Sequence, residues 1–206
     1  MPSYSAVLPK LHEAQETVAN SEARWKVLCA GRRFGKRAWW VAPTFAIARV
    51  GWRAIEAAAM SFPQEIRPKV SIANMEVFFE NGGYIAAKSA DNPQRLRGEG
   101  LDFLVMDEAA FIKPEVWREV LRPTLTERKG SALFISTPMG MNNWFYDLWT
   151  NAQDDENWET FRFSTVDNPA IDPDEVEVAK KEVGSIIFTQ EYLAEFVDNG
   201  QSIVKP

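Results

Sequence analysis

The stretch Ala30-Gly31-Arg32-Arg33-Phe34-Gly35-Lys36 decides the fold of this chain. It follows a short apolar run at 25–29 that is typical of a buried strand. In a loop with this Ala-x4-Gly-Lys pattern, backbone N–H groups cradle phosphates and the lysine reaches the outer ones. The glycines permit the backbone angles that such wrapping needs. Taken alone, the pattern also fits an ordinary basic turn.

A pair of acids, Asp107 and Glu108, closes a second apolar run at 103–106. A continuous apolar run is typical of a central strand in a parallel sheet. At the end of such a strand, Asp107 would hold a magnesium ion through water, and Glu108 would orient and polarise an attacking water. The alternative is a strand followed by an acidic turn. A phosphate loop earlier in the chain favours the first interpretation, an ATP-hydrolysing site.

Arg37 stands where a phosphate loop normally carries the Ser or Thr that ligates magnesium. Arginine has only donors and brings a positive charge, so it cannot ligate a cation. Residues 38–44 are typical of another buried strand that ends in a Pro turn, which leaves no room for the helix whose amino end should hold the phosphates. A crossover between parallel strands needs a dozen residues or more. Either this segment is deleted, or the sequence lacks a stretch of the working protein.

Strands alternate with helices along most of the chain. Further strands are expected at 131–136 and 158–164, and a β-hairpin from 70–79 and 84–89. Helices are expected at 9–20, 44–60, 114–121, 141–152, 173–183 and 186–196. The alternation predicts an α/β fold, a mainly parallel sheet flanked by helices, in one domain spanning 1–206. Ligands bind such sheets at the carboxyl ends of strands, where Lys36, Asp107 and Ser136 all fall.

The composition fits one packed α/β domain, because 46% of the 206 residues are hydrophobic and most of the eight tryptophans fall in apolar segments. The net charge of −6 argues against a basic surface coat, although a local basic channel is compatible with it. With one cysteine, Cys29, and one histidine, His12, no internal disulfide and no His-based metal site or triad is possible. Neither a signal peptide nor an apolar run of membrane length is seen, so we expect a cytoplasmic protein without a membrane partner.

The order of these motifs resembles the ATPase domain of the large terminase subunit, the DNA-packaging motor of tailed bacteriophages. The resemblance extends from about residue 11 to about residue 203 and implies a P-loop fold of the RecA-like (ASCE) type with a β-hairpin insertion. The matching motifs are weak one by one but specific in this order. They are Leu11-His12-Glu13-Ala14-Gln15, residues 31–36, Trp40-Val41-Ala42-Pro43-Thr44, Leu96-Arg97-Gly98, Asp107-Glu108-Ala109-Ala110, Ser136-Thr137-Pro138, Asp167-Asn168-Pro169 and Gln190-Glu191-Tyr192.

The resemblance implies a nucleotide-binding set that comprises an adenine-reading glutamine and the phosphate loop. Lys36 would be the phosphate lysine, while Arg32 and Arg33 would be basic loop residues that sense the γ-phosphate. For the glutamine, the alternative is an ordinary solvated side chain. The full set is Gln15, Gly31, Arg32, Arg33, Gly35 and Lys36.

The resemblance also assigns the catalytic residues. Asp107 and Glu108 match the magnesium aspartate and the catalytic glutamate. Ser136 and Thr137 match the coupling motif that reports hydrolysis to the DNA grip.

An arginine finger, donated to a neighbouring subunit, is the last catalytic group that the resemblance implies. Arg97 is the candidate, with Arg95 or Arg33 as alternatives. Arg97 could equally form a surface salt bridge, because loop arginines are common and fingers are few.

As a terminase ATPase domain, the chain would use ATP and Mg²⁺ and form a homo-oligomeric ring, on a portal, in the host cytoplasm. Its partners would be the small terminase subunit and double-stranded DNA, held through phosphates in a salt-sensitive, sequence-independent way. The ribonuclease-H-type nuclease domain of relatives would begin about where this chain stops. No further strand-end acids are present for a two-metal nuclease, so no nuclease activity is expected in this chain.

Relatives carry a helix of about twenty residues after the phosphate lysine, in keeping with the crossover length such sheets need. Its absence here leaves magnesium binding and turnover open. One rival to the motor is therefore an impaired P-loop domain with a structural or regulatory role, which binds a partner and little nucleotide. A helicase is a second rival, but it would need a second similar core, which the length of the chain does not permit.

Overall fold

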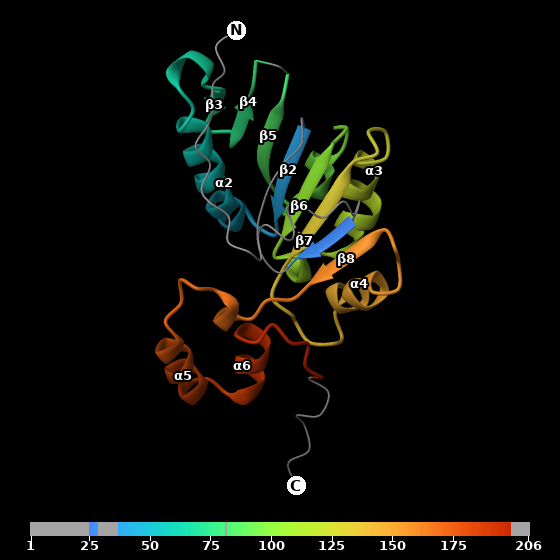
Figure 1. The fold of residues 1–206 in the computed structure, drawn as a ribbon. Helices are drawn as coiled ribbons and strands as arrows, with labels where there is room; N and C mark the ends of the chain where they lie inside the picture. The colour runs from blue at the N-terminus through green and yellow to red at the C-terminus, as the bar shows by residue number, and fades with distance from the viewer. Residues whose placement is uncertain (1–24, 29–36, 81, 199–206) are drawn as a thin grey trace.

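The computed structural model describes residues 25–28, 37–80 and 82–198, and Figure 1 shows them as a single sheet with helices around it. The sheet has eight strands in the order β3-β4-β5-β2-β6-β7-β1-β8. The strands are β1 (Trp25–Leu28), β2 (Arg37–Ala42), β3 (Lys69–Ser71), β4 (Glu76–Phe78), β5 (Tyr84–Ser89), β6 (Phe103–Asp107), β7 (Ser131–Ile135) and β8 (Trp158–Phe161). The strands from β5 to β8 in this order all run parallel, which confirms the predicted mainly parallel sheet.

The predicted β-hairpin is present, but its first arm is not a single strand. Residues 70–79 divide into β3 and β4, which pair antiparallel, and β4 pairs antiparallel with β5. The division falls at a turn in which Met75 has a left-handed backbone, with φ of 55°, and donates its N–H to the carbonyl of Ile72. A left-handed residue reverses the chain, so an apolar stretch of ten residues forms two short strands instead of one.

Helices cover both faces and the carboxyl end of the sheet (Figure 1). The main helices are α2 (Phe45–Met60), α4 (Trp144–Ala152), α5 (Pro173–Glu182) and α6 (Ser185–Glu191). Shorter turns are η1 (Gln64–Ile66), η2 (Pro93–Leu96), η3 (Ala109–Phe111), the π-helical η4 (Val116–Leu121), α3 (Arg122–Thr124) and η5 (Thr165–Asp167). In Figure 1, α5 and α6 form a small pair set apart from the sheet. Within the described residues, no helix is long and apolar enough to cross a membrane.

Local caps explain where two of the helices begin. Helix α2 starts at Phe45 because the Thr44 side chain accepts a hydrogen bond from the N–H of Ile47. Helix α4 starts at Trp144, three residues later than predicted, because the Asn143 side chain caps it through the N–H of Phe145. Ser, Thr, Asn and Asp are the residues that most favour this position.

Strand β2 lies at the centre of the sheet and is buried on both faces. Trp39 and Val41 belong to the core on one face, whereas Trp40 belongs to the core on the other, where α2 packs. Side chains of a strand alternate between faces, so a strand with both faces covered is apolar at nearly every position. The expectation that tryptophans lie mainly in the core holds for Trp39, Trp40, Trp52 and Trp117, each less than 9% exposed.

Candidate active site at the carboxyl edge of the sheet

Asp107 and Glu108 lie beside Ser136 at the carboxyl edge of the sheet. Asp107 is the last residue of β6 and is level with Ile135, the last residue of β7, so the residues that follow each strand are neighbours. Strand β1 ends at the same edge, because Val27 is level with Phe134 of β7. This edge is where ligands bind parallel α/β sheets.

The chain turns sharply at Glu108, directly after β6. The backbone of Glu108 is left-handed, with φ of 50° and ψ of 46°, and its carbonyl accepts a hydrogen bond from the N–H of Phe111, which starts the short turn η3. Left-handed residues other than glycine are uncommon and store a small amount of strain, and they gather at functional sites. At this turn Glu108 is half-buried, at the carboxyl edge of the sheet.

The environment of Glu108 favours its protonated form. Burial is the main reason why the pKa of its carboxyl is raised, and the negative charges of Asp107 and Glu191 raise it further. A hydrogen bond from Ser136 acts in the opposite direction. A carboxylate whose pKa is raised toward the working pH is a better general base than an ordinary surface glutamate.

Ser136, directly after β7, is hydrogen-bonded to residues that follow β6. Its side chain is buried, and its Oγ accepts a hydrogen bond from the N–H of Ala110, at 3.3 Å, and donates to Oε2 of Glu108, at 3.5 Å. Asn143, the cap of α4, donates from Nδ2 to the carbonyl of Ala110 at 3.1 Å. Thr137 follows and is half-buried. A shift of the loop after β7 would therefore change the hydrogen bond between Ser136 and the carboxyl of Glu108.

The donor set at this edge fits magnesium bound together with a phosphate. Magnesium prefers oxygen ligands and usually takes one or two protein carboxylates, completing its shell with water and substrate phosphates. Asp107 and Glu108 provide two carboxylates, whereas the described residues contain no cluster of three or more acidic, His or Cys side chains that could hold a metal alone. Asp107 is the residue that would hold the ion.

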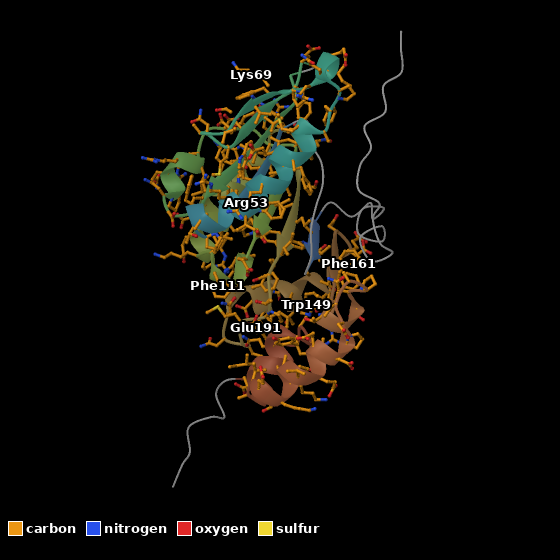
Figure 2. All side chains as sticks on the ribbon, turned by 90° about the vertical axis from the view of Figure 1, so that its left-hand side faces the viewer. Arg53, Lys69, Phe111, Trp149, Phe161 and Glu191 are labelled. Carbon is orange, nitrogen blue, oxygen red and sulfur yellow. The ribbon has the colours of Figure 1, made fainter. Side chains whose placement is uncertain are left out.

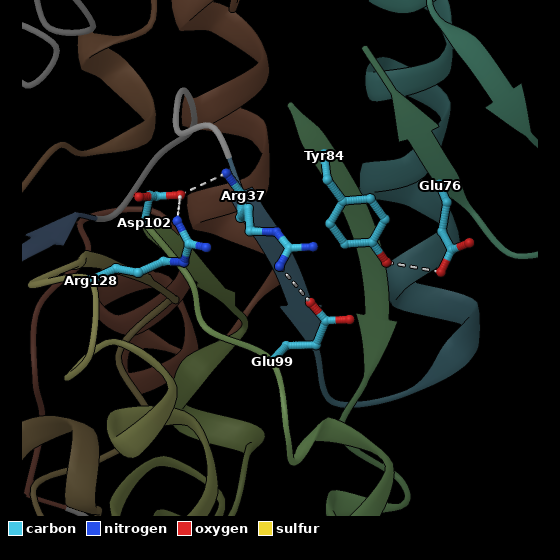
Figure 3. Close-up of polar contacts among 6 residues, drawn as sticks. All are labelled: Arg37, Glu76, Tyr84, Glu99, Asp102 and Arg128. Carbon is cyan, nitrogen blue, oxygen red and sulfur yellow. Dashed lines mark hydrogen bonds and ion pairs between the residues drawn. The ribbon is translucent and has the colours of Figure 1, made fainter. Parts of the chain in front are cut away.

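Arg37, the residue directly after the predicted phosphate lysine, lies at the opposite edge of the sheet. It opens β2, and its N–H donates to Oδ2 of Asp102 at 3.0 Å. Its guanidinium pairs with Glu99 at 3.7 Å, and Arg128 pairs with Asp102 at the same distance (Figure 3). Arg37 thus serves the amino end of β2 and takes no part in the carboxyl-edge site.

Strands β1 and β2 are parallel and are separated in the sheet by β7 and β6. Eight residues lie between Leu28 and Arg37, fewer than the dozen that a parallel crossover requires. The predicted phosphate-loop residues Gly31, Arg32, Arg33, Gly35 and Lys36, and the predicted adenine-reading Gln15, lie outside the described residues.

Arg97 lies on the surface and is not part of the Asp107–Glu108 cluster of this chain. Its Nε donates to Oε1 of Gln94 at 2.9 Å, and its Nη1 donates to the carbonyl of Glu119 at 3.4 Å. The salt bridge considered as its alternative role is not formed with any part of the chain that the structure describes. Arg95 is also exposed.

Residues 53–205 match the protein family described as "Terminase large subunit, T4likevirus-type, N-terminal". The chain belongs to this family of large terminase subunits. The match covers well over half of the 206 residues, and it confirms the resemblance drawn from the sequence motifs.

Large terminase subunits of two phages are among its relatives. That of Escherichia phage T5 is 33% identical over 160 residues, which is 76% of this chain and 36% of the relative. That of Thermus virus P23-45 is 30% identical over 247 residues, covering 94% of this chain and 50% of the relative. This terminase chain therefore spans half or less of their length. The second match is longer than the whole of this chain, so within the matched region that relative contains residues that the chain does not have.

Solved structures of large terminases share the fold. An arginine-to-alanine mutant of the ATPase domain from Thermus phage P74-26 superposes with a TM-score of 0.79 and 26% identity, over 91% of this chain and 95% of that one. The large terminase of another thermophilic bacteriophage, in complex with ADP, superposes with a TM-score of 0.64 and 17% identity, over 78% and 40% of the two chains. These likenesses confirm the predicted α/β P-loop fold.

Two residues of the site had no role assigned from the sequence. Glu191 acts on the ionisation of Glu108, and Gln190 accepts a hydrogen bond from the N–H of Gly140, in the loop after β7. Both belong to the motif Gln190-Glu191-Tyr192, which the sequence marked as a family feature without indicating its function. The fold brings Gln190 to Gly140, fifty positions earlier in the chain, and lets the charge of Glu191 act on Glu108.

Proposed function

We propose that this chain is the ATP-hydrolysing motor domain of a viral DNA-packaging terminase, which couples ATP hydrolysis to the movement of double-stranded DNA into a procapsid. The observation that supports this most is the position of Asp107 and Glu108 at the carboxyl end of β6, with the Ser136 hydroxyl between β6 and β7. In this proposal Asp107 is the magnesium carboxylate and Glu108 is the base, and hydrolysis of a nucleoside triphosphate requires the two side by side.

In the proposed mechanism Asp107 would hold magnesium, which would supply positive charge against the negative charge that develops on the phosphates. Glu108 accepts a hydrogen bond from the attacking water and orients it, and its raised pKa brings it closer to the working pH as a base. The phosphate loop, with Lys36 as its lysine, would hold the nucleotide. The Ser136 hydroxyl donates a hydrogen bond to Glu108, and through this bond a change at the site would move the loop after β7.

The motor would work as a ring of identical subunits on a portal in the host cytoplasm, together with a small terminase subunit. A trans-acting arginine, assigned to Arg97, would complete each site from the neighbouring subunit. DNA would be gripped through its phosphates, with an affinity that falls steeply with salt concentration. We expect this chain to hydrolyse ATP and not to cut DNA.

A second function is favoured by one specific observation, the short link between β1 and β2. Eight residues cannot hold the usual crossover helix, and Arg37 after them lies at the edge of the sheet opposite the acids. A chain of this kind would bind nucleotide poorly and serve as a structural or regulatory partner of another subunit.

One experiment separates the two functions. The intact mass of the purified protein is measured first, and magnesium-dependent ATP binding and turnover are then compared for the wild type, Glu108→Gln, Lys36→Ala and the surface control Glu127→Gln. The motor predicts turnover that Glu108→Gln and Lys36→Ala abolish and Glu127→Gln leaves unchanged. A mass near 23.4 kDa with no binding in the wild type would overturn the motor and support the regulatory domain.

A further inference from the structure

The loop after β7 carries Ser136 at one end and is fastened at the other end to the C-terminal helical pair. Gly140 donates its N–H to Oε1 of Gln190 in α6, at 3.0 Å. The next residue, Met141, donates its N–H to the carbonyl of Val197, at 3.1 Å. Two successive backbone groups of this loop are thus held by the segment that begins with α6.

The loop itself has little freedom between these two ends. Ser136 and Pro138 are buried, and Gly140 is buried with a left-handed backbone, φ of 66°, which few other residues adopt. Gly140 follows Ser136 by only four positions, so a displacement of Gly140 is transmitted over a short segment. The position of Ser136 therefore depends on the bond that holds Gly140.

The contact between Ser136 and Glu108 is sensitive to such a displacement. The Oγ of Ser136 lies 3.5 Å from Oε2 of Glu108, at the long limit of a hydrogen bond, while the N–H of Ala110 donates to the same Oγ at 3.3 Å. A shift of a few tenths of an ångström toward Glu108 would make the bond strong, and the same shift away would remove it.

Helix α6 also brings a charge to the site. Glu191 directly follows Gln190, and its carboxylate is one of the groups that raise the pKa of Glu108, after burial and Asp107. Figure 2 labels Glu191 at the junction between the sheet and the C-terminal helices. Tyr192 holds this end of the helix, because its carbonyl accepts the N–H of Thr165 at 2.7 Å and its ring stacks on Phe188.

We propose that Gln190 is a positioning residue for Glu108: by accepting the N–H of Gly140 it fixes the loop after β7 and so holds the Ser136 hydroxyl against the Glu108 carboxyl. Gln190 touches neither substrate nor metal in this role and acts only through the loop. The inference rests on the proposed function for its relevance to ATP hydrolysis, but the coupling from Gln190 to Glu108 is a property of the folded chain without nucleotide.

The test measures how firmly Ser136 is held, through the N–H of Ala110 that donates to its Oγ. The protein is labelled with ¹⁵N, and hydrogen exchange of the Ala110 amide is followed by NMR at a single pH, without nucleotide. Gln190→Met removes the acceptor at nearly constant size. Gln153→Met makes the same change at an exposed glutamine at the end of α4 and is the matched control. Circular dichroism establishes that each variant is folded.

Gln190→Met is expected to speed hydrogen exchange of the Ala110 N–H, because the loop that carries its acceptor Ser136 is released, and Gln153→Met is expected to leave the exchange rate unchanged. In a Ser136→Ala background, Gln190→Met should add no further increase, since both changes remove the same interaction. An unchanged exchange rate in Gln190→Met would overturn the proposal, and so would an equal increase in the Ser136→Ala background.

Turnover gives a second reading of the same variants and separates this proposal from the proposed function. If the wild type hydrolyses ATP, Gln190→Met should lower kcat about tenfold with KM unchanged, the size typical for losing a residue that orients a reacting group from behind. If the wild type lacks turnover but Gln190→Met speeds exchange of the Ala110 amide, the motor is overturned and the role of Gln190 is supported. If the wild type has turnover but Gln190→Met leaves this exchange unchanged, the motor is supported and the role of Gln190 is overturned.

Discussion

Gly51 of α2 lies directly against the indole ring of Trp40 in β2, and a Cβ added to Gly51 would fall 2.7 Å from Cε2 of that ring. Trp40 is 7% exposed and belongs to the core between α2 and the sheet. Glycine at this position therefore sets how closely the helix approaches the strand, because both the ring and the helix are enclosed by packed neighbours.

Gly51→Ala is predicted to destabilise the fold, even though alanine is the better helix former. The added methyl group overpacks the helix–sheet contact, which costs about 1–3 kcal/mol in the free energy of unfolding. The change is measured by urea unfolding. Gly184→Ala is the control, since a Cβ there meets nothing within 4 Å and φ is −62°, and it should be neutral or slightly stabilising. Equal stability of Gly51→Ala and the wild type would contradict the packing argument.

Tyr84 is predicted to make the fold sensitive to alkali. Burial raises the pKa of its hydroxyl strongly, and the hydrogen bond it donates to Oε1 of Glu76, at 2.9 Å, raises it further (Figure 3). The native state then holds the proton more tightly than the unfolded chain. The contribution of protonated Tyr84 to the free energy of unfolding is complete below the unfolded pKa of about 10. It is lost progressively as the pH rises above that value.

Urea unfolding between about pH 9 and about pH 11 checks this prediction. The wild type should lose stability more steeply over this range than Tyr84→Phe, which has no proton to lose. Glu76→Gln should also flatten the slope, because it removes a charge that raises the pKa of Tyr84. Parallel slopes for the wild type and Tyr84→Phe would show that Tyr84 does not titrate differently in the two states.

The parts of the fold that were predictable from the sequence are those set by local patterns. The apolar run before Asp107 and the apolar run of β2 each predicted a buried parallel strand, and both strands are present. The positions of Asp107 and Ser136 at one edge also follow from local patterns, because each directly continues or ends such a strand.

Tertiary contacts decided the features that were not predictable. The left-handed turn at Met75 divides an apolar stretch that looks like one strand. The last predicted helix ends at Glu191, five residues early, because Ala194 is left-handed with φ of 52° and the N–H of Leu193 turns back to the carbonyl of Phe188. The effect of Glu191 on Glu108 joins residues from α6 and the end of β6, and no spacing along the chain encodes that proximity.

ATP hydrolysis is predicted to fall as the pH is lowered. It should fall at a higher pH than expected for a base with the ordinary glutamate pKa of 4.5. In the proposed mechanism Glu108 is a base only when it is deprotonated, and burial, Asp107 and Glu191 all raise its pKa. The acid limb of the pH profile of kcat/KM therefore lies above 4.5 in the wild type. Glu191→Gln removes one of the charges and should move this limb to lower pH.

The control for that measurement is Glu182→Gln, which neutralises an exposed glutamate at the end of α5. It should leave the acid limb in place, which distinguishes the local effect of Glu191 from a change in net charge. A limb that moves equally in both variants, or in neither, would contradict the assignment of Glu191 to the environment of Glu108.

Arg97 is predicted to act on the site of a neighbouring subunit. Its guanidinium is held on the surface by Gln94 and the carbonyl of Glu119, outside the Asp107–Glu108 cluster of its own chain. Arg97→Ala should therefore lower turnover by a factor of about a thousand or more, as the loss of an arginine finger does, while ATP binding persists. Arg95→Ala should retain turnover if Arg97 is the finger.

Mixing two inactive variants decides whether the arginine acts between subunits. Glu108→Gln subunits keep Arg97, and Arg97→Ala subunits keep Glu108, so a mixed ring contains interfaces at which an intact arginine faces an intact glutamate. Turnover should reappear on mixing, with a maximum near equal amounts, although neither variant is active alone. If the mixture assembles and binds ATP but stays inactive, Arg97 does not serve the neighbouring site, and Arg95 and Arg33 become the residues to test in the same way.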